Sequence, residues 1–260
     1  VIGNPITHSL SPELHNYWIK QNGINGIYNK EELNEDDLKE FFLKIKNKEI
    51  NGANITVPFK KDVISYVDQL SLEAEKTQSV NTVYLKNDKI IGHNTDINGF
   101  ELAIKDANYD VEGKKVLILG AGGVVPSVIF ALYKMKVLSV TISNRTKIKA
   151  ENLKTLFNDL KIIDWGEASS FDMIINATSI GLKKEDKLNL DFSKFQNCEF
   201  FYDVIYNPKE TNFLRDGKSL GKKTENGKKM FIYQAAKSFK IWHGIEPKIN
   251  EQVVGLLDKW

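Results

Sequence analysis

The segment KVLILGAGGVVPS at residues 115–127 constrains the fold of this chain more than any other. It has the pattern of an apolar strand that enters a glycine turn and continues into a helix. In dinucleotide-binding folds such glycines allow a tight turn, and they let the backbone approach a pyrophosphate at the helix N-terminus. Glycine turns after strands are common, so the motif alone is weak. The residues expected to contact the phosphates are Gly120, Ala121, Gly122, Gly123 and Val124.

The end of the next expected strand indicates which dinucleotide binds. A protein that binds NAD usually carries Asp or Glu there to hold the ribose 2′-hydroxyl. This chain has Asn144, Arg145 and Thr146 instead. An acid would repel a 2′-phosphate, whereas an arginine and a hydroxyl would bind it. Arg145 and Arg215 are the only arginines among 36 basic residues. Because arginine is so rare in this chain, its presence here favours a contact with the 2′-phosphate of NADP(H) over the alternative that Arg145 is an ordinary surface residue.

Composition excludes several classes of protein. The net charge is +2 and the lysines are interspersed with acids, so we expect no nucleic-acid partner. No apolar run approaches the roughly 18–20 residues that span a bilayer, so we expect no membrane partner. Cys198 is the single cysteine, which rules out an intrachain disulfide and favours a cytoplasmic location. The four histidines have no paired spacing and predict no metal site.

Apolar strands separated by helices follow from about Gly99 and predict a parallel sheet covered on both faces. These strands are expected at Val116–Leu119, Val140–Ser143, Lys161–Ile163, Met173–Asn176 and Phe200–Val204. Two helices are expected after them, at Lys228–Trp242 and Lys248–Leu257.

The first hundred residues also mix strands and helices. Ser11 and Pro12 have the pattern of a helix cap and first helical residue, and apolar spacing predicts a helix over Asp36–Lys46. Strands are expected at Ile27–Tyr28, Ala53–Val57 and Val80–Leu85, with a hairpin turn at Asn87-Asp88 leading into Ile90-Ile91.

These patterns predict an α/β protein of two domains with a cleft between them. Residues 1–98 plus 231–260 form a discontinuous N-terminal α/β domain that binds substrate, because the late helices are free to pack back on it. Residues 99–230 form a Rossmann-type, doubly wound parallel-sheet domain that binds NADP.

Four polar clusters lie outside the glycine turn, at residues 3–12, 54–60, 81 and 92–96. All except Asn81 are expected at or after a strand end, where ligands bind in open α/β sheets. They offer hydroxyls, amides, a lysine and a carboxylate. This set suits a small, polyhydroxylated, anionic substrate.

Nine segments in order along the chain resemble the shikimate dehydrogenase family. They are GNPITHSLSPELHN, GANITVPFK, VNTVY, GHNTDINGF, GAGG, NRT, INATSIGL, DVIYNPKET and NGKKMFIYQAAKSF. The resemblance implies an oxidoreductase that reversibly reduces 3-dehydroshikimate to shikimate with NADPH. It also implies a place in the shikimate pathway of aromatic amino-acid biosynthesis and a monomer or homodimer.

The resemblance also implies roles for individual residues. Lys60 and Asp96 match the catalytic pair, which we treat as one coupled unit. Substrate-binding roles fall on Ser9, Ser11, Thr56, Lys60, Asn81, Asp96, Tyr206 and Gln234. Cofactor roles fall on the glycine turn, on Asn144, Arg145 and Thr146, on Ala177, Thr178 and Ser179 near the nicotinamide, and on Gly227.

Each of these residues also has a purely structural interpretation. Lys60 could be a solvated lysine beside Lys61, and Asp96 a helix cap. Ser9 could be a turn residue, Tyr206 a packing aromatic, and Gln234 an exposed helix residue. The segment 176–179 could be a plain loop, and His8 and His93 fit hydrogen-bonded loop residues better than acids or bases.

Three other functions remain open from the sequence. A quinate/shikimate dehydrogenase using NAD is disfavoured by Arg145 and by serine at both Ser9 and Ser11. A non-catalytic NADPH-binding sensor of the same fold is disfavoured because Lys60 and Asp96 are both present. A methylene-tetrahydrofolate dehydrogenase would need a more apolar pocket than these loops provide.

Overall fold

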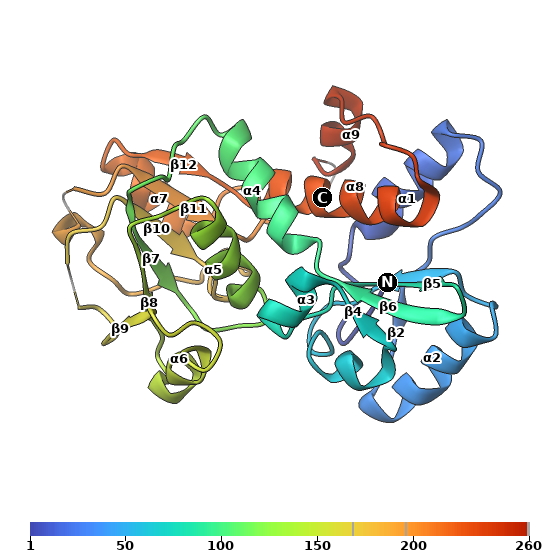
Figure 1. Ribbon diagram of the computed structural model, residues 1–260. Helices are drawn as coiled ribbons and strands as arrows, with labels where there is room; N and C mark the ends of the chain where they lie inside the picture. Colours follow the sequence, from blue (N-terminus) through green and yellow to red (C-terminus); the bar gives the residue numbers. More distant parts are fainter. Residues whose placement is uncertain (168, 196, 259–260) are drawn as a thin grey trace. The chain divides into compact units, whose positions relative to one another are not determined.

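A computed structural model describes residues 1–167, 169–195 and 197–258 of the chain (Figure 1). The described chain divides into two compact units: unit 1 is residues 1–99 with residues 232–258, and unit 2 is Phe100–Phe231. Residues 259–260, at the end of the expected substrate domain, lie outside the described residues. Across the described ranges, no helix has the length and apolarity that crossing a membrane requires.

Unit 2 is built on a six-stranded sheet in which every pairing is parallel. The strands are β7 (Lys115–Leu119), β8 (Ser139–Ser143), β9 (Lys161–Ile163), β10 (Met173–Asn176), β11 (Phe200–Asp203) and β12 (Lys223–Glu225). Their spatial order is β9-β8-β7-β10-β11-β12, which is the doubly wound order of dinucleotide-binding folds. The predicted Rossmann fold is therefore confirmed. Only β12 was missing from the sequence prediction, because its alternation of charged and polar residues carries no apolar signal.

Helices cover both faces of this sheet. They are α4 (Asp96–Asp106), α5 (Val125–Lys134), α6 (Lys147–Leu153) and α7 (Asn212–Ser219). Phe201 of β11 packs against Phe213 of α7, with ring centroids 5.1 Å apart. Its neighbour Tyr202 points to the opposite face, because side chains alternate along a strand, and meets Phe100 of α4 at 5.3 Å. Both faces of the central strands β7, β8, β10 and β11 are consequently buried, apart from the first residues of β7 and β8, as their apolar sequences require.

Unit 1 contains a parallel pair of strands and a mixed four-stranded sheet. The pair is β1 (Ile2–Gly3) with β2 (Glu31–Glu32), and the sheet has the order β3 (Gly52–Asn54), β5 (Thr82–Lys86), β6 (Lys89–His93) and β4 (Gln69–Leu70). A parallel bridge between Ile2 and Ile55 joins the two sheets just past the end of β3. The predicted hairpin turn is confirmed, since Asn87 and Asp88 both have positive φ and connect antiparallel β5 and β6.

The helices of unit 1 follow the predicted apolar spacing with some shifted ends. They are α1 (Ser11–Gln21), α2 (Leu38–Lys46), α3 (Leu72–Thr77), α8 (Lys228–His243), which begins in unit 2, and α9 (Glu251–Leu256). In α2 the apolar residues at helical spacing, Leu38, Phe41, Phe42 and Ile45, are all buried. This helix begins two residues later than expected, because a short 3₁₀ turn over Glu35–Asp37 precedes it.

Three local predictions were wrong. Ile27–Tyr28 is not a strand: both the amide and the carbonyl of Tyr28 bond to the side chain of Asn16, which replaces a strand partner. Ser11 is not the cap of α1 but its first residue, since Leu10 is the N-cap and the Ser9 hydroxyl accepts from the Ser11 amide. The last helix starts at Glu251, where the Asn250 side chain caps it, rather than at Lys248.

Candidate active site and cofactor site

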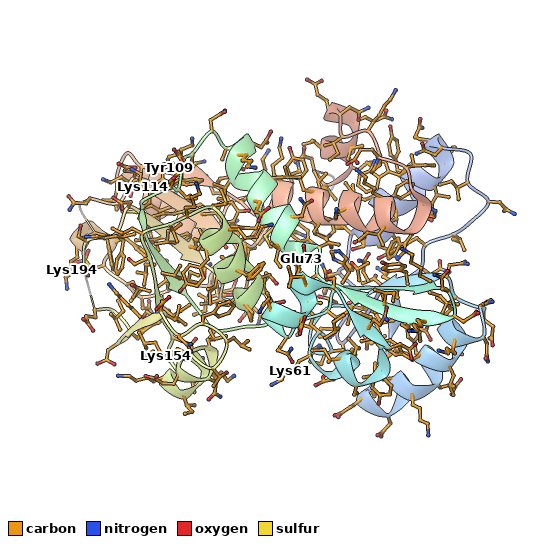
Figure 2. The ribbon with its side chains drawn as sticks, viewed as in Figure 1. Lys61, Glu73, Tyr109, Lys114, Lys154 and Lys194 are labelled. Atoms are coloured by element: carbon orange, nitrogen blue, oxygen red, sulfur yellow. The ribbon has the colours of Figure 1, made fainter. Side chains whose placement is uncertain are left out.

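A buried lysine–carboxylate pair is the centre of the candidate site in unit 1. Lys60 Nζ lies 2.6 Å from Asp96 Oδ2, and the two side chains are 14% and 8% exposed. Asp96 is the first residue of α4, directly after β6. The Lys60 carbonyl accepts from the Val80 amide, which fixes its backbone, whereas Lys61 is on the surface (Figure 2). A charge-assisted hydrogen bond of this length in a mostly buried place holds the ammonium in one direction.

Asn81 completes the surroundings of Asp96. Its Nδ2 donates to Asp96 Oδ1 at 2.8 Å, so each carboxylate oxygen has its own donor. The Oδ1 of Asn81 accepts from the Thr95 amide at 2.7 Å. The amide therefore lies with its nitrogen toward the carboxylate, and the predicted Lys60, Asn81 and Asp96 form one connected group.

The other predicted substrate residues lie on both units. Ser9 and Ser11 lie together, with their hydroxyl oxygens 3.3 Å apart. Thr56 follows the bridge at Ile55 and is half-buried, as is Gln234 on α8. Tyr206 belongs to unit 2, where its ring stacks on Phe231 with centroids 4.4 Å apart.

The glycine turn after β7 has the geometry of a phosphate cradle. Gly120 needs to be glycine, because its φ is +113° and a Cβ would lie 2.8 Å from the Ala177 carbonyl oxygen. Gly123 is different, since nothing lies within 4 Å of a Cβ built there. This open backbone follows β7, whose neighbour β10 belongs to the other half of the sheet, and so lies at the topological switch point. These features fit a dinucleotide.

The residues after β8 fit a 2′-phosphate. The Asn144 side chain donates to the Thr146 carbonyl at 2.7 Å and shapes a turn. The side chains of Arg145 and Thr146 are exposed. A guanidinium and a hydroxyl on one exposed turn can both donate to an anionic group.

The segment after β10 is held by buried polar groups. Asn176 Oδ1 accepts from the amide and the hydroxyl of Thr178, at 3.1 and 2.7 Å. Asn176 in turn donates to Asp203 on β11 at 3.1 Å. Burial raises the pKa of Asp203 to about 6, although hydrogen bonds from Thr211, Ile205 and Asn176 oppose the shift. Ala177 is buried and Ser179 is exposed.

Gly227 has a packing reason to be glycine. A Cβ there would lie 2.0 Å from the carbonyl oxygen of Val204, a distance too short for any side chain to be accommodated. Contact with a cofactor therefore stays a prediction, while close backbone packing explains the residue without it.

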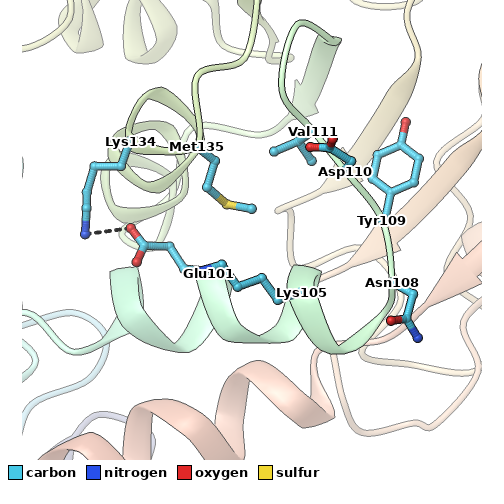
Figure 3. A pocket seen from close by; sticks show the side chains of 8 residues that line it. All are labelled: Glu101, Lys105, Asn108, Tyr109, Asp110, Val111, Lys134 and Met135. Carbon is cyan, nitrogen blue, oxygen red and sulfur yellow. Dashed lines mark ion pairs between the residues drawn. The ribbon is translucent and has the colours of Figure 1, made fainter.

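A pocket in unit 2 lies away from the glycine turn (Figure 3). It is lined by Glu101, Lys105, Asn108, Tyr109, Asp110, Val111, Lys134 and Met135. Tyr109 and Val111 precede β7, so the pocket is at the amino end of that strand, whereas the glycine turn is at its carboxyl end. Lys134 and Glu101 pair across it at 2.7 Å. None of the predicted site residues lines this pocket.

Sequence reasoning missed several polar residues behind the lysine–carboxylate pair. Asn54, Thr82, Thr95 and Ser238 are all buried and hydrogen-bond to one another. All four lie in the segments quoted above, but only the fold shows that Ser238 of α8 meets the other three.

One histidine differs from expectation, and a second, for which the sequence made no prediction, is buried. His93 ends strand β6 rather than lying in a loop. His15 is buried on α1, stacks on Tyr28 at 4.2 Å, and has a pKa held well below its ordinary value by burial. In the ranges that the structure describes, no group of three His, Cys, Asp or Glu side chains could hold a metal ion.

The fold and the site together define an oxidoreductase of the Rossmann class that uses a nicotinamide dinucleotide. Three family profiles match the chain: a shikimate dehydrogenase substrate binding domain over residues 1–83, shikimate/quinate 5-dehydrogenase over 101–187, and a shikimate 5′-dehydrogenase C-terminal domain over 229–251. The chain belongs to the shikimate dehydrogenase family.

Relatives along the whole length agree with this assignment. The chain is 55% identical over 258 residues to a shikimate dehydrogenase (NADP⁺) of Pelagibacter ubique, covering 99% of this chain and 97% of the relative. The crystal structure of shikimate dehydrogenase from Aquifex aeolicus matches with a TM-score of 0.88 and 35% identity, over 100% of this chain and 96% of that one. A Thermus thermophilus enzyme solved with NADP(H) and shikimate also matches with a TM-score of 0.88, at 30% identity, over 99% and 95% of the two chains.

Proposed function

We propose that this protein catalyses the NADPH-dependent, reversible reduction of 3-dehydroshikimate to shikimate, a step in aromatic amino-acid biosynthesis. In this proposal unit 1 binds the substrate and unit 2 binds NADP(H). The observation that carries it is the buried pair of Lys60 and Asp96, with Nζ and Oδ2 2.6 Å apart, in a chain of this family.

The pair suits the proton half of a ketone reduction. Bound NADPH supplies the hydride that goes to the carbonyl carbon. Lys60 stabilises the negative charge that develops on the carbonyl oxygen and donates the proton that completes the hydroxyl. Asp96 directs the ammonium and, through Asn81, is itself fixed. In the reverse direction Lys60 accepts the hydroxyl proton.

The remaining residues hold the substrate in this proposal. The adjacent hydroxyls of Ser9 and Ser11, with Tyr206, bind the substrate carboxylate. Thr56, Asn81, Asp96 and Gln234 bind the ring hydroxyls. Hydroxyls and amides suit this work because each can both donate and accept.

The cofactor is bound through backbone and exposed side chains. The open turn at Gly122 and Gly123 receives the pyrophosphate, because no side chain blocks the approach. Arg145 and Thr146 receive the 2′-phosphate. The segment 177–179, shaped by Asn176 and Asp203, lies along the nicotinamide half. Pro126, in the first turn of α5, has no amide hydrogen to offer the phosphates.

Two alternatives are tested by the same experiment. A quinate/shikimate dehydrogenase that accepts NAD would not need Arg145, and a non-catalytic sensor would not need a paired Lys60 and Asp96.

A cytoplasmic location and a monomeric or homodimeric state remain our expectations from the sequence, the former because Cys198 is a free, buried thiol.

An absorbance assay of nicotinamide reduction, crossing shikimate and quinate with NADP and NAD, tests the proposal. We expect activity largely confined to shikimate with NADP. Strong activity with quinate or NAD would favour the broader dehydrogenase. No activity in any combination, from folded protein that binds NADPH, would favour the sensor.

A further inference from the structure

Ser238 on α8 is a fully buried hydroxyl at the centre of a polar cluster in unit 1. Its Oγ accepts from Asn54 Nδ2 at 3.0 Å and lies 2.9 Å from Thr82 Oγ1 and 3.1 Å from Thr95 Oγ1. It donates to the Gln234 carbonyl at 3.0 Å. A helix from the end of the chain thus inserts one hydroxyl among side chains of β3, β5 and the start of α4.

The hydrogen bonds around Asn81 leave one threonine proton for such an acceptor. Asn81 Oδ1 has two lone pairs, and the Thr95 amide uses one. The hydroxyls of Thr82 and Thr95, at 3.0 and 3.2 Å, compete for the other. Each hydroxyl has a single proton, so the threonine that does not bond to Asn81 needs a different acceptor. Ser238 Oγ, at 2.9 and 3.1 Å, is nearer to either threonine hydroxyl than the two are to each other, at 3.3 Å, and its own proton is directed to the Gln234 carbonyl.

We propose that Ser238 is a positioning residue for the reaction, acting through Thr82, Thr95 and Asn81 on the pair of Asp96 and Lys60. This inference rests on the proposed function. Ser238 bonds to the two threonine hydroxyls that contact the Asn81 oxygen, and Asn81 bonds to Asp96 Oδ1 at 2.8 Å. The direction in which Lys60 points therefore depends on a hydroxyl that bonds to neither Lys60 nor Asp96.

Burial makes this dependence strong. Asn54, Asn81, Thr82, Thr95 and Ser238 are each at most 6% exposed. Without Ser238 one threonine hydroxyl loses its nearer acceptor in a place of low dielectric, and it turns toward Asn81 or toward the other threonine, 3.3 Å away. Either change alters the hydrogen bonds that orient the Asn81 amide.

The first test compares Ser238→Ala with Ser79→Ala. Ser79 is a matched control because it is a buried serine of the same unit whose hydroxyl has no hydrogen-bond partner in the structure. We expect Ser238→Ala to lower kcat for shikimate oxidation about tenfold while the KM values for shikimate and NADP change less than about twofold. Ser79→Ala should leave all three constants unchanged.

A double-mutant cycle separates positioning from a general loss of structure. If Ser238 acts through Asn81, then Ser238→Ala should have little further effect on kcat in an Asn81→Ala background. A purely structural defect would lower kcat by the same factor in both backgrounds. Ser238→Cys, of similar volume but weaker in hydrogen bonding, should give an intermediate kcat and covers the case in which the alanine variant does not fold.

The outcomes distinguish this proposal from the proposed function. A wild-type protein without shikimate activity would overturn both. An active wild type with a folded, fully active Ser238→Ala variant would overturn only the positioning role, as would equal losses of kcat in the two backgrounds.

Discussion

The two candidate sites of this molecule are built in opposite ways. In unit 1 the reactive groups are buried side chains whose hydrogen bonds are made within the protein, and Asp96 has a donor on each oxygen. In unit 2 the expected cofactor contacts come from open backbone at Gly122 and Gly123 and from the exposed side chain of Arg145. One site is preorganised, and the other offers donors that have no acceptor among the residues that the structure describes.

The difference follows from what each site does. Proton transfer requires a donor that is held in a defined direction before the substrate arrives, because a misplaced donor lowers the rate of the reaction. A phosphate brings its own strong charge, so backbone amides and an arginine suffice to bind it. Changes to the group of Lys60, Asn81 and Asp96 should therefore act on kcat, and changes to the cofactor contacts of unit 2 on cofactor affinity.

The largest effect should come from Lys60→Ala. Removing the proton donor should lower kcat by about 10³-fold while the KM for shikimate changes less than about threefold. Steady-state kinetics measure both constants, with Lys61→Ala as the control, since that neighbouring lysine is exposed. Normal turnover by the Lys60 variant would show that another group supplies the proton.

Replacing Asp203 tests whether a buried polar group in unit 2 contributes to the stability of the protein. Its pKa is about 6 in the folded protein, above the ordinary 3.8, so folding favours the protonated form. This contribution to stability is complete below about pH 4 and is lost as the pH rises through about 6. Relative to Asp203→Asn, the wild type should lose about 3 kcal/mol of unfolding free energy between about pH 4 and about pH 7.

Denaturant unfolding of both proteins at the two pH values measures this difference. Asp191→Asn is the control with the opposite sign, because hydrogen bonding to Ser193 lowers the pKa of that exposed aspartate. A difference between wild type and Asp203→Asn that does not vary with pH would mean that Asp203 titrates normally.

Arg145→Ala should affect the choice of cofactor. Losing a charge-assisted contact of about 1.5–3 kcal/mol should raise the Kd for NADP by about 10- to 100-fold and leave the weaker binding of NAD nearly unchanged. Fluorescence titration measures both affinities. Arg215→Ala is a matched control on α7, where the arginine is half-exposed and near Glu210. Equal losses for the two cofactors would remove the argument for a 2′-phosphate site.

The smallest effect on stability should come from Gly123→Ala. The site has open space and no positive φ, so the unfolding free energy should stay the same or rise by less than about 1 kcal/mol. The added methyl group should nevertheless weaken NADP binding severalfold, because it occupies the approach of the pyrophosphate. Gly120→Ala should instead lower the Tm, since its φ is +113°. Unchanged NADP affinity for Gly123→Ala would place the phosphates elsewhere.

The amino-acid sequence by itself determined the architecture of unit 2. Unbroken apolar strands can be buried only between two layers of helices, so β7, β8, β10 and β11 were predicted nearly to the residue. The roles of the glycine turn and Arg145 were also predictable, because each motif consists of a few consecutive residues.

Only the tertiary structure decided how the site in unit 1 is supported. Four separate segments supply the supporting side chains, which are Asn54, Thr82, Thr95 and Ser238. Nothing in the local sequence distinguishes any of them from an ordinary polar residue. Tyr28 was predicted to lie in a strand, yet Asn16 bonds its backbone and its phenol donates to Asn54. Hydrogen bonds between distant segments leave no local periodicity in a sequence, because they depend on where the chain brings each side chain rather than on its neighbours.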